Sequence, residues 1–164
     1  MCSSDLAMNP FDAIGTARIS SAVYDRVCRL SVDYQGSDEE AAIVRRVVGA
    51  DTVPADWMAK VVTVVRRTRS HGDLRVGSSV RGAIDCALVA KSLSDLRGLP
   101  IEHPLVGIDA ALVALSGRVR LREGSARTTE DIVREIWADV FGVQNEDGRE
   151  GKAGAPTGAT NSHS

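Results

Sequence analysis

The chain has 164 residues, of which 43% are hydrophobic, 26% charged and 4% aromatic, and its net charge at pH 7 is −2. This composition suffices for one ordinary domain with an aliphatic core, and the net charge gives no overall case for nucleic-acid binding. No apolar run reaches the roughly 20 residues of a membrane helix, and no leader peptide is visible. Three widely spaced cysteines form neither a disulfide framework nor a zinc motif, so we expect a reducing, cytoplasmic setting.

The first predicted elements form the edge of a sheet. The stretch "SSAVYDRV" is typical of a short helix capped by Ser20 or Ser21. Residues 28–34, "CRLSVDY", alternate between apolar and polar side chains, which predicts a strand with one buried face. Inner strands of a parallel sheet are apolar on both faces, so this alternation indicates an edge strand.

The sequence that follows predicts helices. "SDEE" at residues 37–40 is a capping box, and Ile43, Val44, Val47 and Val48 follow it as an apolar stripe that Gly49 ends. A second helix opens at Pro54. Its apolar stripe comprises Trp57, Val61, Val64, Val65 and Thr68.

Three more helices are predicted beyond residue 70. One runs from about Ser79 to Leu96, with Ile84 and Leu88 facing inward and Gly98 ending it. Another follows Pro104. "GRVRLREGS" is a polar, alternating connection that suits a hairpin arm, and a last helix begins where Thr128 and Asp131 form a cap. Residues 143–164 are rich in Gly, Ala, Ser, Thr and charge, and we expect a disordered tail there.

Arg81 raises the sharpest question about function. Ser78 or Ser79 caps the predicted helix, which places Arg81 in the first turn, where a cation opposes the helix dipole. An anion in front of this helix end would remove the conflict, because free N–H groups and a guanidinium would both face it. The alternative is an arginine that bends away into water, and spacing alone favours that alternative.

Other candidate residues also have ordinary structural explanations. Arg26 follows a short helix, where a cation suits the dipole, and Asn9 before Pro10 is a common turn starter. His71 and His103 have no partner at metal-ligand spacing. A basic cluster comprises Arg118, Arg120, Arg122 and Arg127. A solvated surface is the favoured interpretation of that cluster, with a nucleic-acid or partner contact as the alternative.

Several catalytic motifs are missing from the sequence. It holds no phosphate-loop motif, because "REGKAG" has the wrong spacing and follows no strand. It also lacks an apolar strand ending in Asp-Glu, a G-x-S-x-G motif and an H-E-x-x-H motif. The sequence therefore predicts neither a nucleophile nor a metal site within this chain.

Taken in order, these segments resemble a known family. "AMNPFDAIGTARISSAVYDRVCRLSVDYQGSDEE" is similar to the end of the ATPase core of MoxR-family AAA+ proteins, and "LRVGSSVRGAID" is similar to their lid segment. The resemblance covers residues 7–141. It implies a mainly α chain, in which residues 7–34 are the C-terminal edge of an α/β AAA+ core and residues 35–142 are a helical lid bundle.

The resemblance also implies roles for three residues. Asn9 matches sensor 1, which positions the attacking water, Arg26 matches the arginine finger, and Arg81 matches sensor 2, which reaches the bound phosphates. Positive charges converging on a phosphoryl group are what such a transition state requires. The sequence departs from the common family form in having Val80 where a Pro precedes the sensor 2 arginine.

The parent implied by the resemblance hydrolyses ATP with Mg²⁺ as a homo-oligomeric ring, expected to be a hexamer. It would remodel or load client proteins, often ones with von Willebrand factor A domains. Composition, apart from the resemblance, predicts no membrane partner and argues against nucleic acid. The phosphate loop and magnesium motif would then lie upstream. We expect residues 1–6, "MCSSDL", to be translated sequencing adapter, because GTG-TGC-TCT-TCC-GAT-CT encodes them when GTG starts translation.

Two other functions fit the sequence without this resemblance. One is a free-standing helical interaction module with no nucleotide chemistry. The other is a nucleic-acid-binding helical protein, which rests on the late arginines alone. An upstream phosphate loop would separate the ATPase from the interaction module, and salt-sensitive binding would indicate nucleic acid.

Overall fold

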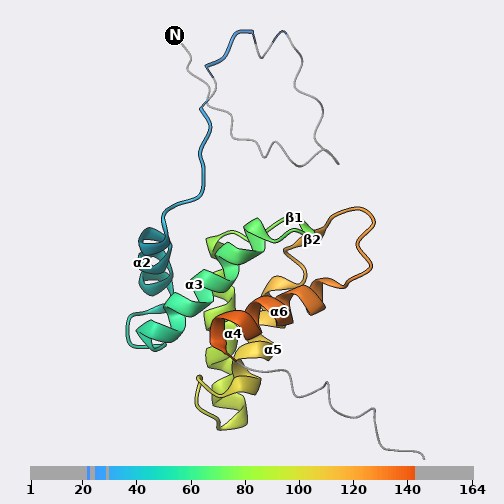
Figure 1. Ribbon diagram of the computed structural model, residues 1–164. Coiled ribbons are helices and arrows are strands. Elements are labelled where there is room, and N and C mark those ends of the chain that lie inside the picture. Colours follow the sequence, from blue (N-terminus) through green and yellow to red (C-terminus); the bar gives the residue numbers. More distant parts are fainter. Residues whose placement is uncertain (1–21, 23–24, 29, 143–164) are drawn as a thin grey trace, which may run out of the picture. The chain divides into compact units, whose positions relative to one another are not determined.

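The computed structural model describes residues 22, 25–28 and 30–142 of the chain. It divides the chain into two units, Met1–Asp33 and Tyr34–Ser164. The described part of the second unit is mainly α-helical (Figure 1). Its elements, in chain order, are α2 (Ser37–Val48), α3 (Ala55–Ser70), β1 (Leu74–Val76), α4 (Val80–Arg97), α5 (Pro104–Leu115), β2 (Arg120–Leu121) and α6 (Thr129–Phe141).

The strand predicted for residues 28–34 is wrong for its described residues. Cys28 and residues 30–34 adopt no regular structure, and the side chains of Leu30 and Val32 are 86% and 79% exposed. A strand needs hydrogen bonds from a neighbouring strand, and the described ranges provide no such neighbour beside this segment. The expected edge of an α/β core is therefore not seen in the described residues, and most of the preceding helix and Asn9 lie outside them.

Helix α3 lies at the centre of the bundle and contacts α2, β1, α4 and α6. Each residue of its predicted stripe is buried: Trp57, Val61, Val64, Val65 and Thr68. Met58 and Val62 are buried as well, so α3 meets neighbours on more than one side. Beta-branched residues thus fill a helix here, because burial on several faces outweighs their weak helix propensity.

Helix α2 begins as predicted but is capped one residue earlier. Gly36 occupies the N-cap position, and its backbone N–H donates to Glu39 Oε2 over 3.0 Å. Ser37 is the first helical residue rather than the cap. The inward face also differs from the predicted stripe, because Glu40 is buried with Val44 and Val48 whereas Val47 is 58% exposed.

Helices α4 and α5 form an antiparallel hairpin with a face of small residues. The buried residues of α4 are Gly82, Ala83, Cys86, Ala87 and Ala90, and those of α5 include Gly107, Ala110, Ala111 and Ala114. Leu88 was predicted to face inward but is 44% exposed. Small side chains allow two helices to approach closely, so the core is built on the alanine face instead. Burial raises the pKa of the Cys86 thiol to about 12.

A two-stranded antiparallel ribbon joins the two ends of this hairpin. Leu74 of β1 pairs with Leu121 of β2, and Val76 pairs with Arg120. "GRVRLREGS" was predicted as a hairpin arm, and it does contribute a strand. Its partner, however, lies before α4 rather than in an adjacent hairpin.

Helix α6 is capped as predicted and closes the core. The backbone N–H of Asp131 donates to Thr128 Oγ1, and the backbone N–H of Thr128 donates to Asp131 Oδ2, each over 3.1 Å. Trp137 stacks on Phe141 with ring centroids 4.0 Å apart, and Trp57 of α3 meets Trp137 edge-on at 6.2 Å. These three rings supply the aromatic part of a core that is otherwise aliphatic.

Candidate functional site

Arg81 occupies the first turn of α4, as predicted. The side chain is exposed, the first turn holds no acidic residue, and Ser79 at the N-cap makes no side-chain capping hydrogen bond. Backbone bonding begins where Gly82 N–H donates to the Ser79 carbonyl over 2.9 Å. The amides of Val80 and Arg81 therefore have no acceptor among the described residues. Two N–H groups without an acceptor in the described ranges thus lie at the positive end of the helix, in the turn that carries Arg81.

The turn before α4 is fixed tightly against α3. The backbone N–H of Ser78 donates to Thr68 Oγ1 over 2.8 Å, and Arg69 Nε donates to the Ser78 carbonyl over 2.7 Å. A Cβ on Gly77 would lie 2.5 Å from the Cα of Arg69. Only glycine can approach the α3 backbone this closely, and the start of α4 is positioned as a result.

The acidic residue of α4 that lies nearest to Arg81 in the sequence pairs with another arginine. Asp85 lies four residues further along α4, where it could pair with Arg81 on the same helix face. Instead Asp85 accepts from Arg118, which follows α5. Arg81 forms no ion pair with any residue in the described ranges. The sequence places Arg81 correctly, but the competition for Asp85 depends on a residue 33 positions away.

The other two predicted site residues, Asn9 and Arg26, belong to the first unit of the chain. Arg26 is exposed in a turn of the first unit. Asn9 lies outside the described residues. The roles that the resemblance implies for Asn9, and for Arg26 at the neighbouring subunit's nucleotide, stay predictions.

A buried ion cluster was missed by the sequence analysis. The side chain of Glu40 is 1% exposed, and its carboxylate lies 3.1 Å from Arg66 Nη1 and 2.8 Å from Arg69 Nη2. Burying a carboxylate is costly unless it is paired, and here two guanidiniums from α3 pair with it. One signal was available, because Glu40, Val44 and Val48 repeat every four residues on one face of α2.

The cluster also holds the segment that leads into α2. Arg66 Nη1 donates to the Gln35 carbonyl over 2.9 Å. The guanidinium carbon of Arg69 lies 3.9 Å from the centroid of the Tyr34 ring, in cation–π contact. The residues just before α2 are thus bound to α3 by the same two arginines that pair with Glu40.

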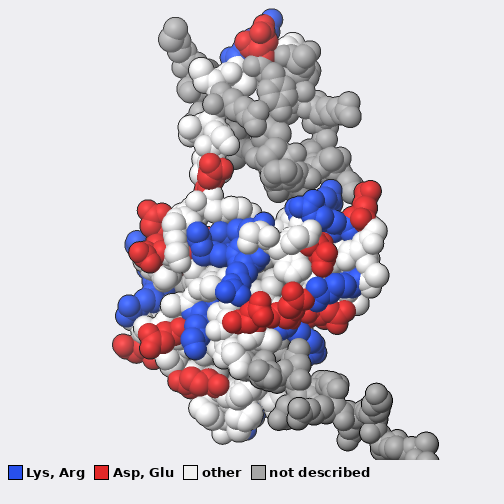
Figure 2. Space-filling model, viewed as in Figure 1, with Lys and Arg blue, Asp and Glu red and all other residues white. Residues whose placement is uncertain are grey.

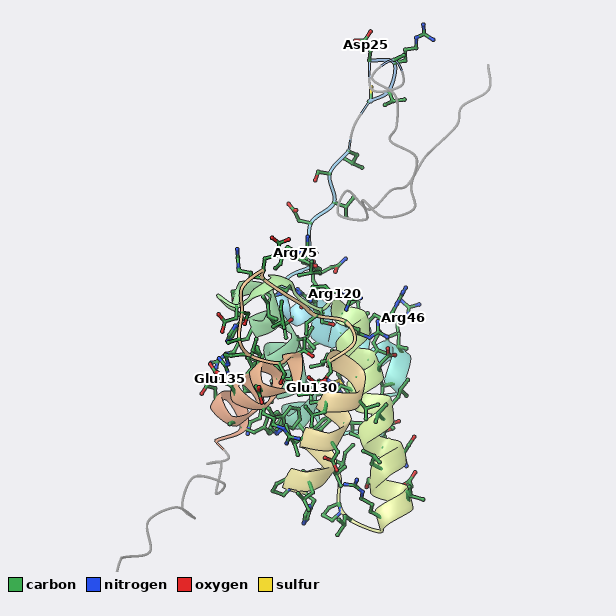
Figure 3. The ribbon with its side chains drawn as sticks, turned by 90° about the vertical axis from the view of Figure 1, so that its right-hand side faces the viewer. Asp25, Arg46, Arg75, Arg120, Glu130 and Glu135 are labelled. Carbon is green, nitrogen blue, oxygen red and sulfur yellow. The ribbon has the colours of Figure 1, made fainter. Side chains whose placement is uncertain are left out.

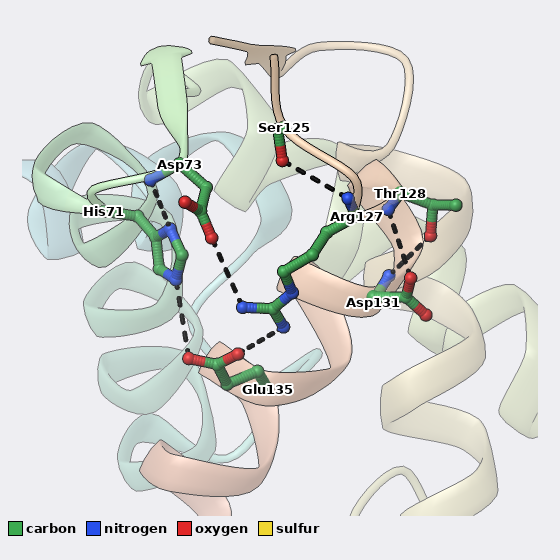
Figure 4. Close-up of polar contacts among 7 residues, drawn as sticks. All are labelled: His71, Asp73, Ser125, Arg127, Thr128, Asp131 and Glu135. Atoms are coloured by element: carbon green, nitrogen blue, oxygen red, sulfur yellow. Dashed lines mark hydrogen bonds and ion pairs between the residues drawn. The ribbon is translucent and has the colours of Figure 1, made fainter.

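Two arginines of the basic cluster, Arg118 and Arg127, form ion pairs with acidic side chains. Arg127 pairs with Asp73, 3.4 Å away, and with Glu135 of α6, while His71 Nε2 lies 3.5 Å from the same glutamate (Figure 4). The hydrogen bond from Arg127 holds the pKa of Glu135 below its usual range, and it raises the pKa of Arg127. This network joins the loop after α3 to the last helix and supports a structural role.

Three exposed arginines without an ion-pair partner among the described residues lie in the ribbon or directly beside it. Arg75, Arg120 and Arg122 are exposed, and Arg120 donates only to the carbonyls of Gly117 and Val119, at 2.9 and 3.2 Å. Arg75 and Arg120 lie at the same end of the bundle (Figure 3). Figure 2 shows a second group of basic side chains at the middle of the visible face, and basic and acidic side chains lie side by side over much of the rest of it.

The described ranges hold few other features of a site. An open groove of about 450 Å³ is lined by Pro54, Trp57, Lys60, His103, Trp137 and Phe141, among others. His103 is a helix cap, since its Nδ1 accepts from Leu105 N–H over 3.3 Å. Within the described part of the chain, no three His, Cys, Asp or Glu side chains are grouped to hold a metal ion. None of the helices described has the length and apolarity needed to cross a membrane.

Comparisons with family models, with curated proteins and with solved structures find no match to this chain.

Proposed function

We propose that residues 35–142 are the helical lid of an ATP-hydrolysing AAA+ protein of the MoxR type, and that Arg81 contacts the nucleotide phosphates. The observation that carries this proposal is the state of Arg81. It sits at the positive end of an 18-residue helix, beside two unbonded amides, and its nearest intrahelical carboxylate is engaged by Arg118. A phosphate would satisfy these donors together.

In this proposal Arg81 and the first turn of α4 would contact one side of a bound ATP. A bound nucleotide would supply the phosphoryl group and Mg²⁺ would neutralise the charge that develops on the leaving group, while Arg81 would bind and orient the phosphate oxygens. Because the Gly77–Ser79 turn is fixed on α3, the whole bundle would move with Arg81. The position of the lid would therefore depend on whether Arg81 binds a nucleotide phosphate.

The rest of the proposal rests on the resemblance. Asn9 would position the attacking water, and Arg26 would serve the neighbouring subunit's nucleotide in a cytoplasmic ring, expected to be hexameric. The ring would remodel client proteins, among them von Willebrand factor A domain proteins. Arginine fingers contribute about 10³–10⁵ in rate in related phosphoryl-transfer systems, so Arg26 has the larger expected effect on hydrolysis.

The deciding experiment starts at the genomic locus. A phosphate loop encoded in frame upstream of Ala7 is the expected result, whereas a native stop codon and start codon there would contradict the proposal. In the full-length protein, Arg81→Ala should weaken ATP binding or hydrolysis, and Arg81→Lys should restore them only in part, because an ammonium lacks the planar fork. Arg75→Ala removes an exposed arginine from the adjacent strand and serves as the control.

The role of Arg26 needs a mixing experiment. Arg26→Ala should abolish most hydrolysis while leaving nucleotide binding nearly intact. Mixing this variant with a subunit defective in its own phosphate loop should restore activity at interfaces that pair an intact finger with an intact loop. Mixed rings that form but recover no activity would refute action in trans.

One observation favours a second candidate, a helical interaction module without nucleotide chemistry. Helix α5 contains a single charged residue, Asp109, which pairs with Arg97 at 2.7 Å. Leu105 and Val113 on the same helix are 58% and 71% exposed, and a helix that is apolar all round is normally covered. Arg81→Ala without effect on the full-length protein, together with partner binding lost in Val113→Asp, would favour this candidate.

A further inference from the structure

The side chain of Arg69 contacts three separate segments of the described chain. Its Nη2 lies 2.8 Å from Glu40 Oε1 on α2, its Nε donates to the Ser78 carbonyl over 2.7 Å, and its guanidinium carbon lies 3.9 Å from the Tyr34 ring centroid. The Arg69 side chain is only 13% exposed. Burial and charge together therefore hold the Arg69 side chain in place at these three contacts.

We infer that Arg69 is a positioning residue that couples the segment Tyr34–Gly36 to the first turn of α4. Tyr34 is the first residue of the second unit, so this segment follows directly on the first unit in the chain. Ser78 lies three residues before Arg81. A displacement of Tyr34 would remove one of the contacts of Arg69. Arg69 in turn binds the Ser78 carbonyl in the turn from which α4 starts.

Neighbouring contacts on both sides of Arg69 make this path specific. The Ser78 N–H is held by Thr68, the residue before Arg69, and Gly77 lies directly on the backbone of Thr68 and Arg69. On the other side, Arg66 holds the Gln35 carbonyl and shares Glu40 with Arg69. The incoming segment and the start of α4 are thus bound to the same last turns of α3, with Arg69 between them.

The functional part of this inference rests on the proposed function. If Arg81 contacts phosphate, Arg69 fixes the turn from which the helix that carries Arg81 begins. Motion between the two units would then be transmitted to the phosphate site. The physical coupling between Tyr34 and α4 exists without nucleotide, and it can be measured in the 164-residue chain alone.

The test uses amide hydrogen exchange of the whole chain, with Ser78 and Gly82 as probes because both N–H groups are hydrogen-bonded. Arg69→Lys keeps the charge beside Glu40 but removes the fork that also reaches Ser78. Exchange at both probes should become roughly ten- to a hundredfold faster, the range expected for a hydrogen bond to a charged group. Arg67→Lys is the control, because Arg67 pairs only with Asp139, 3.5 Å away on α6.

Coupling is tested by combining variants. Tyr34→Ala should speed exchange at Ser78 and Gly82 roughly two- to fivefold, as for a cation–π contact at the surface, although Tyr34 touches neither residue. In an Arg69→Lys background the same substitution should add nothing. An undiminished effect of Tyr34→Ala in that background, or unchanged exchange in Arg69→Lys, would overturn the inference.

A further pair of variants keeps the test decisive if Arg69→Lys fails to fold. Tyr34 is 56% exposed, so its substitutions should leave the core intact. Tyr34→Phe keeps the ring and should exchange like the parent chain, whereas Tyr34→Ala should not. Equal exchange in these two variants would overturn the inference. Because no nucleotide is used, failure here is distinct from failure of the proposed function, which Arg81→Ala tests in the full-length protein.

Discussion

Gly77→Ala is expected to disrupt the attachment of α4 to α3. A Cβ at this position would lie 2.5 Å from Arg69 Cα, 2.6 Å from Arg69 N and 2.7 Å from Thr68 C. All three atoms belong to the backbone of α3, so no side chain can turn aside to make room. Ordinary contact begins at 3.4 Å, and the turn would have to move away by about 0.9 Å, the difference between that contact distance and 2.5 Å.

The magnitude follows from what this movement breaks. Ser78 N–H would leave Thr68 Oγ1, now 2.8 Å away, and Arg69 Nε would leave the Ser78 carbonyl, now 2.7 Å away. A neutral hydrogen bond contributes about 0.5–1.5 kcal/mol and a charged one about 1.5–3 kcal/mol. Residual crowding costs a further amount of about 1–3 kcal/mol. Together these terms amount to a loss of about 3–7 kcal/mol, a large share of the roughly 5–15 kcal/mol that holds most domains folded.

Urea unfolding followed by far-UV circular dichroism measures this loss. Gly72→Ala is the matched control, because a Cβ there meets nothing within 4 Å; it should be neutral or stabilise the fold by up to about 1 kcal/mol through the unfolded state. A Gly77→Ala chain within about 0.5 kcal/mol of the parent, the range of an ordinary surface substitution, would refute the argument that the turn is clamped on α3.

Three further substitutions probe other parts of the bundle. Gly107→Ala places a Cβ 2.5 Å from Trp137 Cζ2 and should cost about 1–3 kcal/mol with a shift in tryptophan fluorescence; unchanged fluorescence and stability would contradict the packing described. Thr128→Ala removes the side-chain cap of α6 and should cost about 1 kcal/mol in urea unfolding, whereas Thr128→Ser should cost little; equal losses would argue against capping. The fold lowers the pKa of Glu135 from its ordinary value of 4.5. Its carboxylate should therefore stabilise the fold at pH values above 4.5, and this contribution should be lost as the pH falls below 4.5. Glu135→Gln should therefore weaken the dependence of stability on pH in that acid range, and an unaltered dependence would show that the ion pair with Arg127 contributes nothing.

The helices were predictable because their signals are local. The apolar repeats of α3, the Thr128–Asp131 cap and Gly98 at the end of α4 each act within a few residues of chain. Gly98 indeed adopts the left-handed conformation, with φ of 63°. Such signals need no knowledge of what lies across the core.

The features that sequence analysis missed depend on distant partners. Glu40 is buried only because Arg66 and Arg69, from the next helix, neutralise it. The two-residue strand β2 exists only because β1 lies beside it. Conversely, the alternation at residues 28–34 predicted a strand whose described residues have no neighbour to pair with. Pairing is a property of two segments, so a one-segment pattern cannot establish it.

The candidate site shows the same division. The position of Arg81 in the first turn follows from "GSSVRGAID" alone. That Arg81 has no ion-pair partner in the described ranges follows from Arg118, which is remote in sequence and engages Asp85. The clamp through Arg69 likewise needed the fold, because nothing in the spacing of Tyr34, Arg69 and Ser78 indicates that they meet.

The ribbon of β1 and β2 has a consequence for the order of folding. It brings together the chain just before α4 and the chain just after α5, and Arg122 N–H donates to the Asp73 carbonyl over 2.9 Å. Closing so long a loop in an open chain is entropically costly. Once α4 and α5 have folded back on each other through their short connection, however, the two ends are already neighbours. We therefore expect the hairpin to form early and the ribbon to close afterwards. In a folding experiment, substitutions in the alanine face should slow folding, whereas substitutions in the ribbon should mainly speed unfolding.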